Sequence, residues 1–258
     1  MGTDEALLRT AEAKEALPTL RIYAWSQPTV SVGYRQSLAD ALDLPACRRL
    51  GLDWVRRLTG GRAVVHDQEV TYSFAGSRTG IFGSFSVREA YRWVHRSLRA
   101  ALEGLGIRLD PPEPTRRAPE PPESLPCFAV ASGHEITVNQ RKLVGSAQKW
   151  TRRAFLQHGS ILLDVDEPLW ARATRAPLQA MQAVGLYELA AGRPDHGILV
   201  EALEREFEMA FGEPASESRL SPKEARIASW LAREKYGSSR WTLGRSEPET
   251  GEPAKGET

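Results

Sequence analysis

Apolar residues recur at helical spacing most clearly between Ser86 and Leu105. The apolar positions in this segment are Val87, Tyr91, Val94, Leu98, Leu102 and Leu105. Because residues three or four apart share one face of an α-helix, this pattern predicts an amphipathic helix, which Gly106 ends. Similar patterns predict four further helices, over Asp4–Ala16, Ala39–Leu50, His196–Phe211 and Pro222–Tyr236. Thr3 is the expected N-cap of the first, and Pro45 is expected to break the second.

Shorter segments alternate between apolar and polar residues and predict strands. The predicted strands are Leu20–Trp25, Thr29–Val32, Trp54–Leu58, Arg62–His66, Glu69–Phe74, His134–Val138, Arg141–Lys149 and Ser160–Leu163. Successive side chains of a strand point to opposite faces, so Val70, Tyr72 and Phe74 are expected on one face. Thr71 and Ser73 are expected on the other face. Strands interleaved with helices indicate an α/β fold, with a mixed sheet and flanking helices, rather than a doubly wound parallel sheet.

Proline and glycine mark the segments that connect these elements. Asp110–Pro126 contains seven prolines and is expected to form an extended surface loop that leads directly to Cys127. Asn139 and Gln140 are expected to turn a hairpin, and because Gln140 is strained in a type I′ turn, a looser hairpin is predicted. The polar tail from Gly244 onward is expected to be disordered.

Composition excludes several classes of protein. The 258 residues carry 34 Lys and Arg against 33 Asp and Glu, a net charge of +1, which argues against binding nucleic acid by bulk charge. No segment approaches the roughly 18 apolar residues that span a membrane, so no membrane association is expected. With two cysteines a disulfide framework is excluded, and the cytoplasm is the expected location. The five histidines lack the spacing of metal ligands, so no metal is expected.

Two polar segments could carry chemistry. Gly60 and Gly61 follow Arg57 between two predicted strands, where glycine lets backbone N–H groups approach a ligand; a plain hairpin turn is the alternative. In the second segment, alternation places four residues on one strand face, with Leu143 opposite: Lys142, Val144, Ser146 and Gln148. This face suggests a cleft, with Gly145 and Ala147 behind it allowing close backbone packing. A solvated edge strand is the alternative.

The two cysteines have different surroundings. A free cysteine is more often a small buried apolar residue than a nucleophile, and Cys47 fits that description. Cys127 instead follows a rigid proline-rich connection and precedes the hairpin that carries Lys142. A thiol with an ordinary pKa of about 8.5 is only about 3% ionised at pH 7. A nearby ammonium that lowered the thiol pKa by about two units would raise that fraction to about three quarters.

Three motifs together resemble one superfamily, that of the lipoate–protein ligases, octanoyltransferases and biotin ligases. They are Arg56–Asp67 (RRLTGGRAVVHD), Glu135–Gln148 (EITVNQRKLVGSAQ) and Leu156–Leu162 (LQHGSIL). The Asp4–Leu8 segment and Lys235–Gly237 extend the likeness over nearly the whole chain. The resemblance implies a single lipoate/biotin ligase-like catalytic domain over residues 10–225, a helical segment over 226–243 and a disordered tail over 244–258. Relatives usually carry a strand before the first helix, so an edge strand is absent here or the chain starts late.

Within that superfamily the chain resembles the LipM-type octanoyltransferases, because Cys127 lies fifteen residues before Lys142 and Gly61 is followed by Arg62 rather than a third glycine. The resemblance implies that Cys127 is the acyl-thioester nucleophile and that Lys142 lowers its pKa. It also implies a set of substrate-binding residues, namely Arg57, Gly60, Gly61, His66, Ser146, Gln148 and His158.

The implied reaction moves octanoyl from acyl carrier protein to a lysine of a lipoyl domain, such as glycine cleavage H protein or a 2-oxoacid dehydrogenase E2. Neither ATP nor a metal is expected as a cofactor. The protein is expected to be a monomer. Three alternatives remain: an ATP-dependent lipoate ligase, an amidotransferase between lipoyl proteins, and a non-catalytic carrier-protein docking module. One stripe of the long predicted helix could steer acidic partners or be an ordinary solvated face; it consists of Arg88, Arg92, Arg96 and Arg99.

Overall fold

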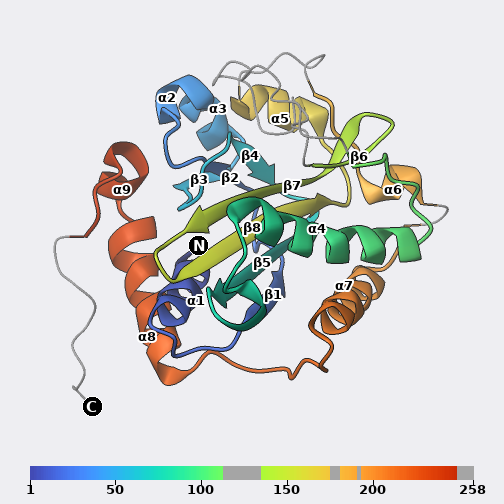
Figure 1. Cartoon of the computed structure of the whole chain (residues 1–258). Coiled ribbons are helices and arrows are strands. Elements are labelled where there is room, and N and C mark those ends of the chain that lie inside the picture. The colour runs from blue at the N-terminus through green and yellow to red at the C-terminus, as the bar shows by residue number, and fades with distance from the viewer. Residues whose placement is uncertain (113–134, 175–180, 191–192, 249–258) are drawn as a thin grey trace.

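The structure is a computed structural model of the chain, and it describes residues 1–112, 135–174, 181–190 and 193–248. The predicted proline-rich connection lies largely outside these ranges, and Cys127 lies wholly outside them. Within them, the expected α/β architecture of a mixed sheet with flanking helices is confirmed (Figure 1). None of the described helices is long and apolar enough to cross a membrane.

The larger of two sheets is antiparallel throughout and has the strand order β1-β5-β8-β7-β6. Its strands are β1 (Thr19–Tyr23), β5 (Glu69–Ser77), β6 (Ile136–Val138), β7 (Arg141–Trp150) and β8 (Ala154–Leu162). The predicted alternation in β5 is confirmed: Tyr72 and Phe74 enter the main hydrophobic cluster, whereas Thr71 and Ser73 bond polar groups on the other face.

A smaller sheet lies against that second face and has the order β3-β2-β4. Its strands are β2 (Thr29–Val32), β3 (Asp53–Arg56) and β4 (Val64–His66), with β2 parallel to β3 and antiparallel to β4. Two short helices join β2 to β3, namely α2 (Leu38–Ala41) and α3 (Leu44–Arg49). The predicted helix is interrupted, as expected, but the break precedes Pro45: this proline lies in the first turn of α3, where a missing N–H costs nothing.

The helix α4 (Val87–Gly104) covers the first face of the larger sheet together with α7 (His196–Phe211) (Figure 1). Ser86 and Glu89 form a capping box that fixes the start of α4. Its apolar stripe buries Val94, Leu98 and Leu102, as expected, but Val87 in the first turn is 56% exposed.

The helix α1 (Gly2–Glu12) packs on the second face, beside the smaller sheet, through Leu7, Leu8 and Ala11. It begins earlier than predicted, with Met1 rather than Thr3 as N-cap. The helix α8 (Pro222–Trp230) and the following turn of π-helix η4 (Leu231–Tyr236) pack against α1. There the buried Lys235 pairs with Glu5 and Glu247. The remaining elements are η1 (Gly80–Phe82), α5 (Glu167–Thr174), α6 (Leu186–Leu189) and α9 (Ser239–Gly244).

The turn between β6 and β7 is tighter than predicted. Asn139 and Gln140 both adopt left-handed conformations, with φ of 50° and 64°, and Val138 pairs directly with Arg141. The strain expected at Gln140 is offset because the Asp110 carboxylate accepts the backbone N–H groups of both turn residues, at 3.0 and 2.8 Å. The prediction of a looser hairpin is therefore wrong.

Candidate functional site

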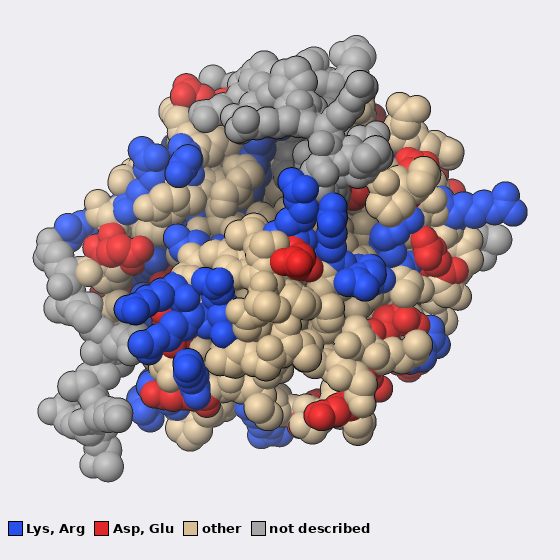
Figure 2. All heavy atoms as spheres, viewed as in Figure 1, with Lys and Arg blue, Asp and Glu red and all other residues tan. Residues whose placement is uncertain are grey.

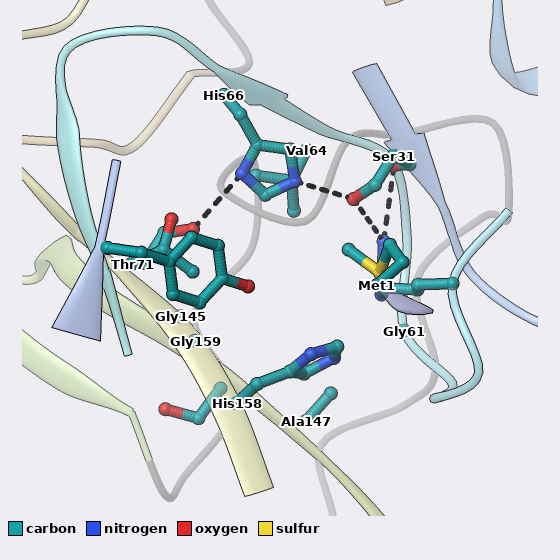
Figure 3. A pocket seen from close by; sticks show the side chains of 14 residues that line it. Met1, Ser31, Gly61, Val64, His66, Thr71, Gly145, Ala147, His158 and Gly159 are labelled. Carbon is teal, nitrogen blue, oxygen red and sulfur yellow. Dashed lines mark hydrogen bonds between the residues drawn. The ribbon is translucent and has the colours of Figure 1, made fainter. Parts of the chain in front are cut away.

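A pocket lies between the two sheets and encloses about 440 Å³ of space, its open mouth included. One wall comes from the smaller sheet, and the other from the facing strands of the larger sheet (Figure 3). The lining residues that matter below are Ser31, Arg57, Gly61, His66, Gly145 and His158. Residues from all three motifs therefore meet at one place.

Arg57 organises the glycine turn from within. Its guanidinium donates to the carbonyl oxygens of Gly60 at 2.8 Å and Arg62 at 2.7 Å. These bonds hold the turn in a shape in which Gly61 has a φ of 88°, a conformation that glycine adopts without strain. Gly61 lines the pocket, whereas Gly60 lies at the exposed tip of the turn with nothing near the position of an added Cβ.

His66 is held on three sides. Its Nε2 atom lies 2.7 Å from the Ser31 hydroxyl, and its Nδ1 atom lies 2.8 Å from the Glu69 carboxylate. The Trp25 ring stacks on the imidazole at a centroid distance of 4.2 Å. The ring is 5% exposed, so its position and hydrogen-bond directions are set before any ligand arrives.

His158 lies on the opposite side of the pocket and connects α1 to the glycine turn. Its Nε2 atom lies 2.7 Å from the Thr59 hydroxyl, and its Nδ1 atom lies 3.5 Å from the Asp4 carboxylate. Burial lowers the pKa of His158, and the neighbouring Asp4 offsets this effect only in part. The imidazole is therefore neutral at pH 7. With its one proton on Nδ1, facing the ionised Asp4, its Nε2 atom accepts a hydrogen bond from the Thr59 hydroxyl.

Asp4 is a buried carboxylate with several donors. It accepts from the Arg21 guanidinium at 2.8 Å, from the Ser73 hydroxyl at 2.9 Å and from the Tyr23 hydroxyl at 3.1 Å. Burial opposes ionisation, but His158, the amino terminus and Arg21 together hold the pKa of Asp4 well below its usual range. Asp4 is therefore ionised, and it fixes the ring of His158.

The face of β7 that lines the pocket is not the predicted one but the opposite face. Gly145 pairs with Ser160, and Ala147 pairs with His158, so these small residues line the pocket. Ser146 borders it, but its hydroxyl bonds to Tyr72 at 2.7 Å on the side covered by α4. Gln148 likewise bonds to Gln157, away from the pocket. Gly145 and Ala147, which were expected to lie behind the cleft, therefore form its floor.

Lys142 does not continue that strand face. The pairing of β6 with β7 shifts register between Ile136 and Thr137, and Leu143 and Val144 both enter the main cluster. The extra residue of such a bulge interrupts the alternation. Lys142 is fully buried, does not line the pocket, and forms an ion pair with Glu135. Cys127 lies outside the described residues, so its distance from Lys142 stays a prediction.

Motif analysis did not reveal the roles of several residues at the site. Trp25, Ser31 and Glu69 lie outside the motifs, whereas Asp4, Thr59 and Glu135 lie within the matched segments but carry no separate signal there. The one available signal was the polar side of β5, where Glu69, Thr71 and Ser73 follow one another at every second position. Across residues 1–112, 135–174, 181–190 and 193–248, no three His, Cys, Asp or Glu side chains gather so that they could hold a metal ion.

Comparison with known proteins gives a consistent assignment. The family model for the lipoyl protein ligase A/B catalytic domain matches residues 1–191. The chain is 37% identical to the octanoyltransferase LipM of Kyrpidia tusciae, over 93% of this chain and 92% of the relative. It is 34% identical to the octanoyltransferase LipM of Bacillus subtilis, over 95% of this chain and 93% of the relative.

Solved structures share the fold. A lipoate-protein ligase A bound with ATP superimposes with a TM-score of 0.80 at 24% identity, covering 94% of this chain and 92% of that one. A putative lipoate protein ligase from Thermoplasma acidophilum with bound lipoic acid superimposes with a TM-score of 0.79 at 23% identity, with the same coverage. At these identities the likeness concerns the fold alone.

Proposed function

The chain belongs to the lipoyl protein ligase A/B family and to its octanoyltransferase LipM group, and we propose that it transfers octanoyl from acyl carrier protein to a lysine of a lipoyl domain. The observation that carries this proposal is the match to octanoyltransferases along nine-tenths of the chain, at 35% identity in the case of Geobacillus kaustophilus. An acyltransferase of this kind takes part in protein lipoylation.

The proposed first step forms an acyl-enzyme. The thiolate of Cys127 attacks the octanoyl thioester, the bond from the carbonyl carbon to the phosphopantetheine sulfur breaks, and that sulfur leaves as a thiol after taking up a proton. Exchange of one thioester for another is nearly isoenergetic, so the step needs no ATP and no metal. Lys142 supplies the positive charge that keeps Cys127 ionised. Its pairing with Glu135 supports this role, because a buried ammonium needs an anion in order to stay charged.

The proposed second step moves the acyl group to the ε-amine of the acceptor lysine. The neutral nitrogen attacks the carbonyl carbon of the acyl-enzyme, the C–N bond of the amide forms, the C–S bond breaks, and Cys127 leaves as a thiolate while the nitrogen loses its extra proton to solvent. The reaction runs downhill because an amide is more stable than a thioester.

The pocket supports the binding of an acyl chain and its thioester. Gly145 and Gly159 leave bare backbone on its floor, and a Cβ at Gly159 would lie 2.4 Å from the Gly145 carbonyl oxygen. Val64 contributes an apolar side wall. We place Arg57, Gly61, His66 and His158 around the reacting carbonyl, since their polar groups border the same space (Figure 3).

The surface over α4 fits an acidic partner. Arg88, Arg92 and Arg96 are exposed along this helix, and Figure 2 shows basic side chains outnumbering acidic ones there. Complementary charge steers a partner and raises its association rate. We propose that acyl carrier protein and the lipoyl domain approach over this helix.

One assay separates the proposal from its alternatives. The protein is incubated with octanoyl acyl carrier protein and a lipoyl domain, with and without ATP, and the mass of the lipoyl domain is followed. A gain of one octanoyl group without ATP is expected. A gain that needs ATP and free octanoate would indicate a ligase, and a gain only from an octanoylated lipoyl protein would indicate an amidotransferase. Binding without any transfer would indicate a docking module.

A further inference from the structure

We propose that Ser31, His66 and Glu69 form a proton-accepting chain that deprotonates the ε-ammonium of the acceptor lysine before it attacks the acyl group. The proposal rests on the proposed function, and it names the group that makes the second step possible. Two members of the chain, Ser31 and His66, line the pocket (Figure 3). Glu69 does not line it and is reached through Nδ1 of His66.

The second step needs such a group. A lysine amine has an ordinary pKa of about 10.4, so only about 0.04% of it is neutral at pH 7. The ammonium form has no lone pair and cannot attack a carbonyl carbon. Lys142 is not placed to accept this proton, because it is fully buried, forms an ion pair with Glu135 and does not line the pocket.

The hydrogen-bond directions along the chain are fixed from both ends. Arg57 can only donate, and its Nη1 atom lies 3.1 Å from the Ser31 oxygen. Ser31 therefore uses its own proton toward Nε2 of His66, which leaves the second ring nitrogen, Nδ1, to donate to Glu69. In this arrangement the Ser31 oxygen keeps one lone pair for a donor that enters the pocket, and a proton passed to it continues to Nε2.

Glu69 is suited to stabilise the cation that His66 becomes. One of its oxygens, Oε1, accepts hydrogen bonds from Nδ1 of His66 and from the hydroxyl groups of Thr71 and Ser160. The other oxygen, Oε2, is buried and has no hydrogen-bond partner within the described part of the chain. Among those residues, the ion pair that Glu69 forms is with His66 alone. A protonated His66 would supply the positive charge that this carboxylate lacks.

His158 is a weaker candidate for the same task, although it has a similar arrangement. Its carboxylate neighbour Asp4 lies farther away, at 3.5 Å, and already pairs with Arg21. A positive charge on His158 would therefore be stabilised less by its neighbouring carboxylate. The two histidines of the pocket thus have different surroundings, and His66 is the one prepared to accept a proton.

The protons and bonds balance as follows. The ammonium loses one proton through Ser31 to His66, and the neutral nitrogen attacks the carbonyl carbon of the acyl-enzyme. The C–N bond forms, the C–S bond breaks, and the cysteine leaves as a thiolate. The amide nitrogen loses its second excess proton to solvent, and His66 returns its proton to solvent before the next turnover.

The test compares two amines on the same acyl-enzyme. The full-length His66→Gln variant is acylated with octanoyl acyl carrier protein, and decay of the adduct is followed by intact mass with a lipoyl domain or with hydroxylamine at pH 7. Hydroxylamine is already neutral at this pH and needs no proton acceptor. We expect transfer to the lipoyl domain to fall by about 100-fold or more, and the hydroxylamine reaction to fall much less. We also expect the defect to shrink as the pH rises toward the pKa of lysine.

Controls keep the outcomes distinct. The His196→Gln variant changes an exposed histidine and should match the wild type in both reactions. Because only acylated molecules are followed, a partly unfolded preparation does not alter the ratio of the two rates. Glu69→Gln provides a second variant, which should also lose reaction with the lipoyl domain much more than reaction with hydroxylamine. An unimpaired transfer to lysine, or equal losses with both amines, would overturn the proposal. A wild type that forms no adduct at all would instead overturn the proposed function.

Discussion

The Nε2 atom of His158 lies 2.7 Å from the hydroxyl oxygen of Thr59, a residue 99 positions earlier in the chain. This contact joins the glycine-rich motif to the third motif at the wall of the pocket. Asp4, from the first helix, holds the other side of the same imidazole. The integrity of the pocket therefore depends on α1, which contributes no side chain to either motif.

Replacing Asp4 should destabilise the protein in a pH-dependent way. Its pKa is depressed in the folded state, so its ionised form contributes stability above the ordinary aspartate pKa of about 3.9 and loses it as the pH falls through the folded value. We expect Asp4→Asn to lower the free energy of unfolding by about 3 kcal/mol at pH 7, because Arg21 loses a buried partner.

Urea unfolding of both proteins from pH 7 to pH 2.5 measures this effect. The difference between wild type and Asp4→Asn should narrow below a pH of about 4. Glu217→Gln, which changes an exposed carboxylate, serves as the control and should leave stability unchanged throughout. A difference for Asp4→Asn that stays constant down to the lowest pH would contradict the assignment.

The glycine turn should tolerate substitution at one position and not at another nearby. A Cβ at Gly33 would lie 1.8 Å from the carbonyl oxygen of Gly61, so Gly33→Ala should displace the turn and cost at least about 1–3 kcal/mol. Gly60 has open space around it, and Gly60→Ala should leave the melting temperature nearly unchanged. Thermal unfolding compares the two variants, and equal melting temperatures would show that the close approach is not present.

Removing the charge of Lys142 should affect the ionisation of Cys127. In Lys142→Met the midpoint of alkylation of Cys127 with iodoacetamide should move up toward a pH of about 8.5, and acyl-enzyme formation at pH 7 should fall by about 25-fold. Lys149→Met, on the same strand, is the matched control, because that lysine lies over the Tyr34 ring instead. An unchanged alkylation profile in Lys142→Met would exclude the proposed electrostatic role.

Reversing charge on α4 should slow the approach of acidic partners. We expect the double variant Arg92→Glu and Arg96→Glu to reduce the association rate of acyl carrier protein by about tenfold at low salt, with the difference disappearing at high salt. Stopped-flow binding measures these rates. A pair of changes at Arg219 and Arg226, which are exposed near α8, provides the control. If both double variants behave alike, this face of α4 is an ordinary solvated surface.

Local patterns predicted the fold class and most of the longer elements, but not α5, α6 or α9, and only the end of β8. The helix α7 has the predicted bounds His196–Phe211, and the polar face of β5 was correctly assigned from alternation. Period and alternation depend on neighbours in the chain, and these patterns carry most of the information about secondary structure. The three motifs likewise identified β4, β7, β8 and the glycine turn as parts of the pocket, but not β2 or β5.

Interactions between distant segments could not be predicted from such patterns. The hairpin turn is tight because Asp110, about thirty residues earlier, accepts its N–H groups. The bulge beside Lys142 breaks the alternation that the interpretation of β7 assumed, so Lys142 does not share a face with Ser146 and Gln148. Which face of β7 borders the pocket depends instead on where the smaller sheet packs, and that face carries Gly145 and Ala147. The carboxylate of Asp4 acts through His158, a residue of a distant segment, which single-sequence periodicity does not reveal.

The most direct test of the central claim is to locate the octanoyl group on the enzyme. The wild type, Cys127→Ala and Cys47→Ala are each mixed with octanoyl acyl carrier protein, quenched in acid, digested and analysed by peptide mass. Cys47 is buried, and burial raises the pKa of its thiol, so Cys47→Ala should behave as the wild type does. We predict one octanoyl adduct on the peptide that contains Cys127 in these two proteins and none in Cys127→Ala. Full transferase activity in Cys127→Ala, or an adduct that maps to any other residue, would contradict the account.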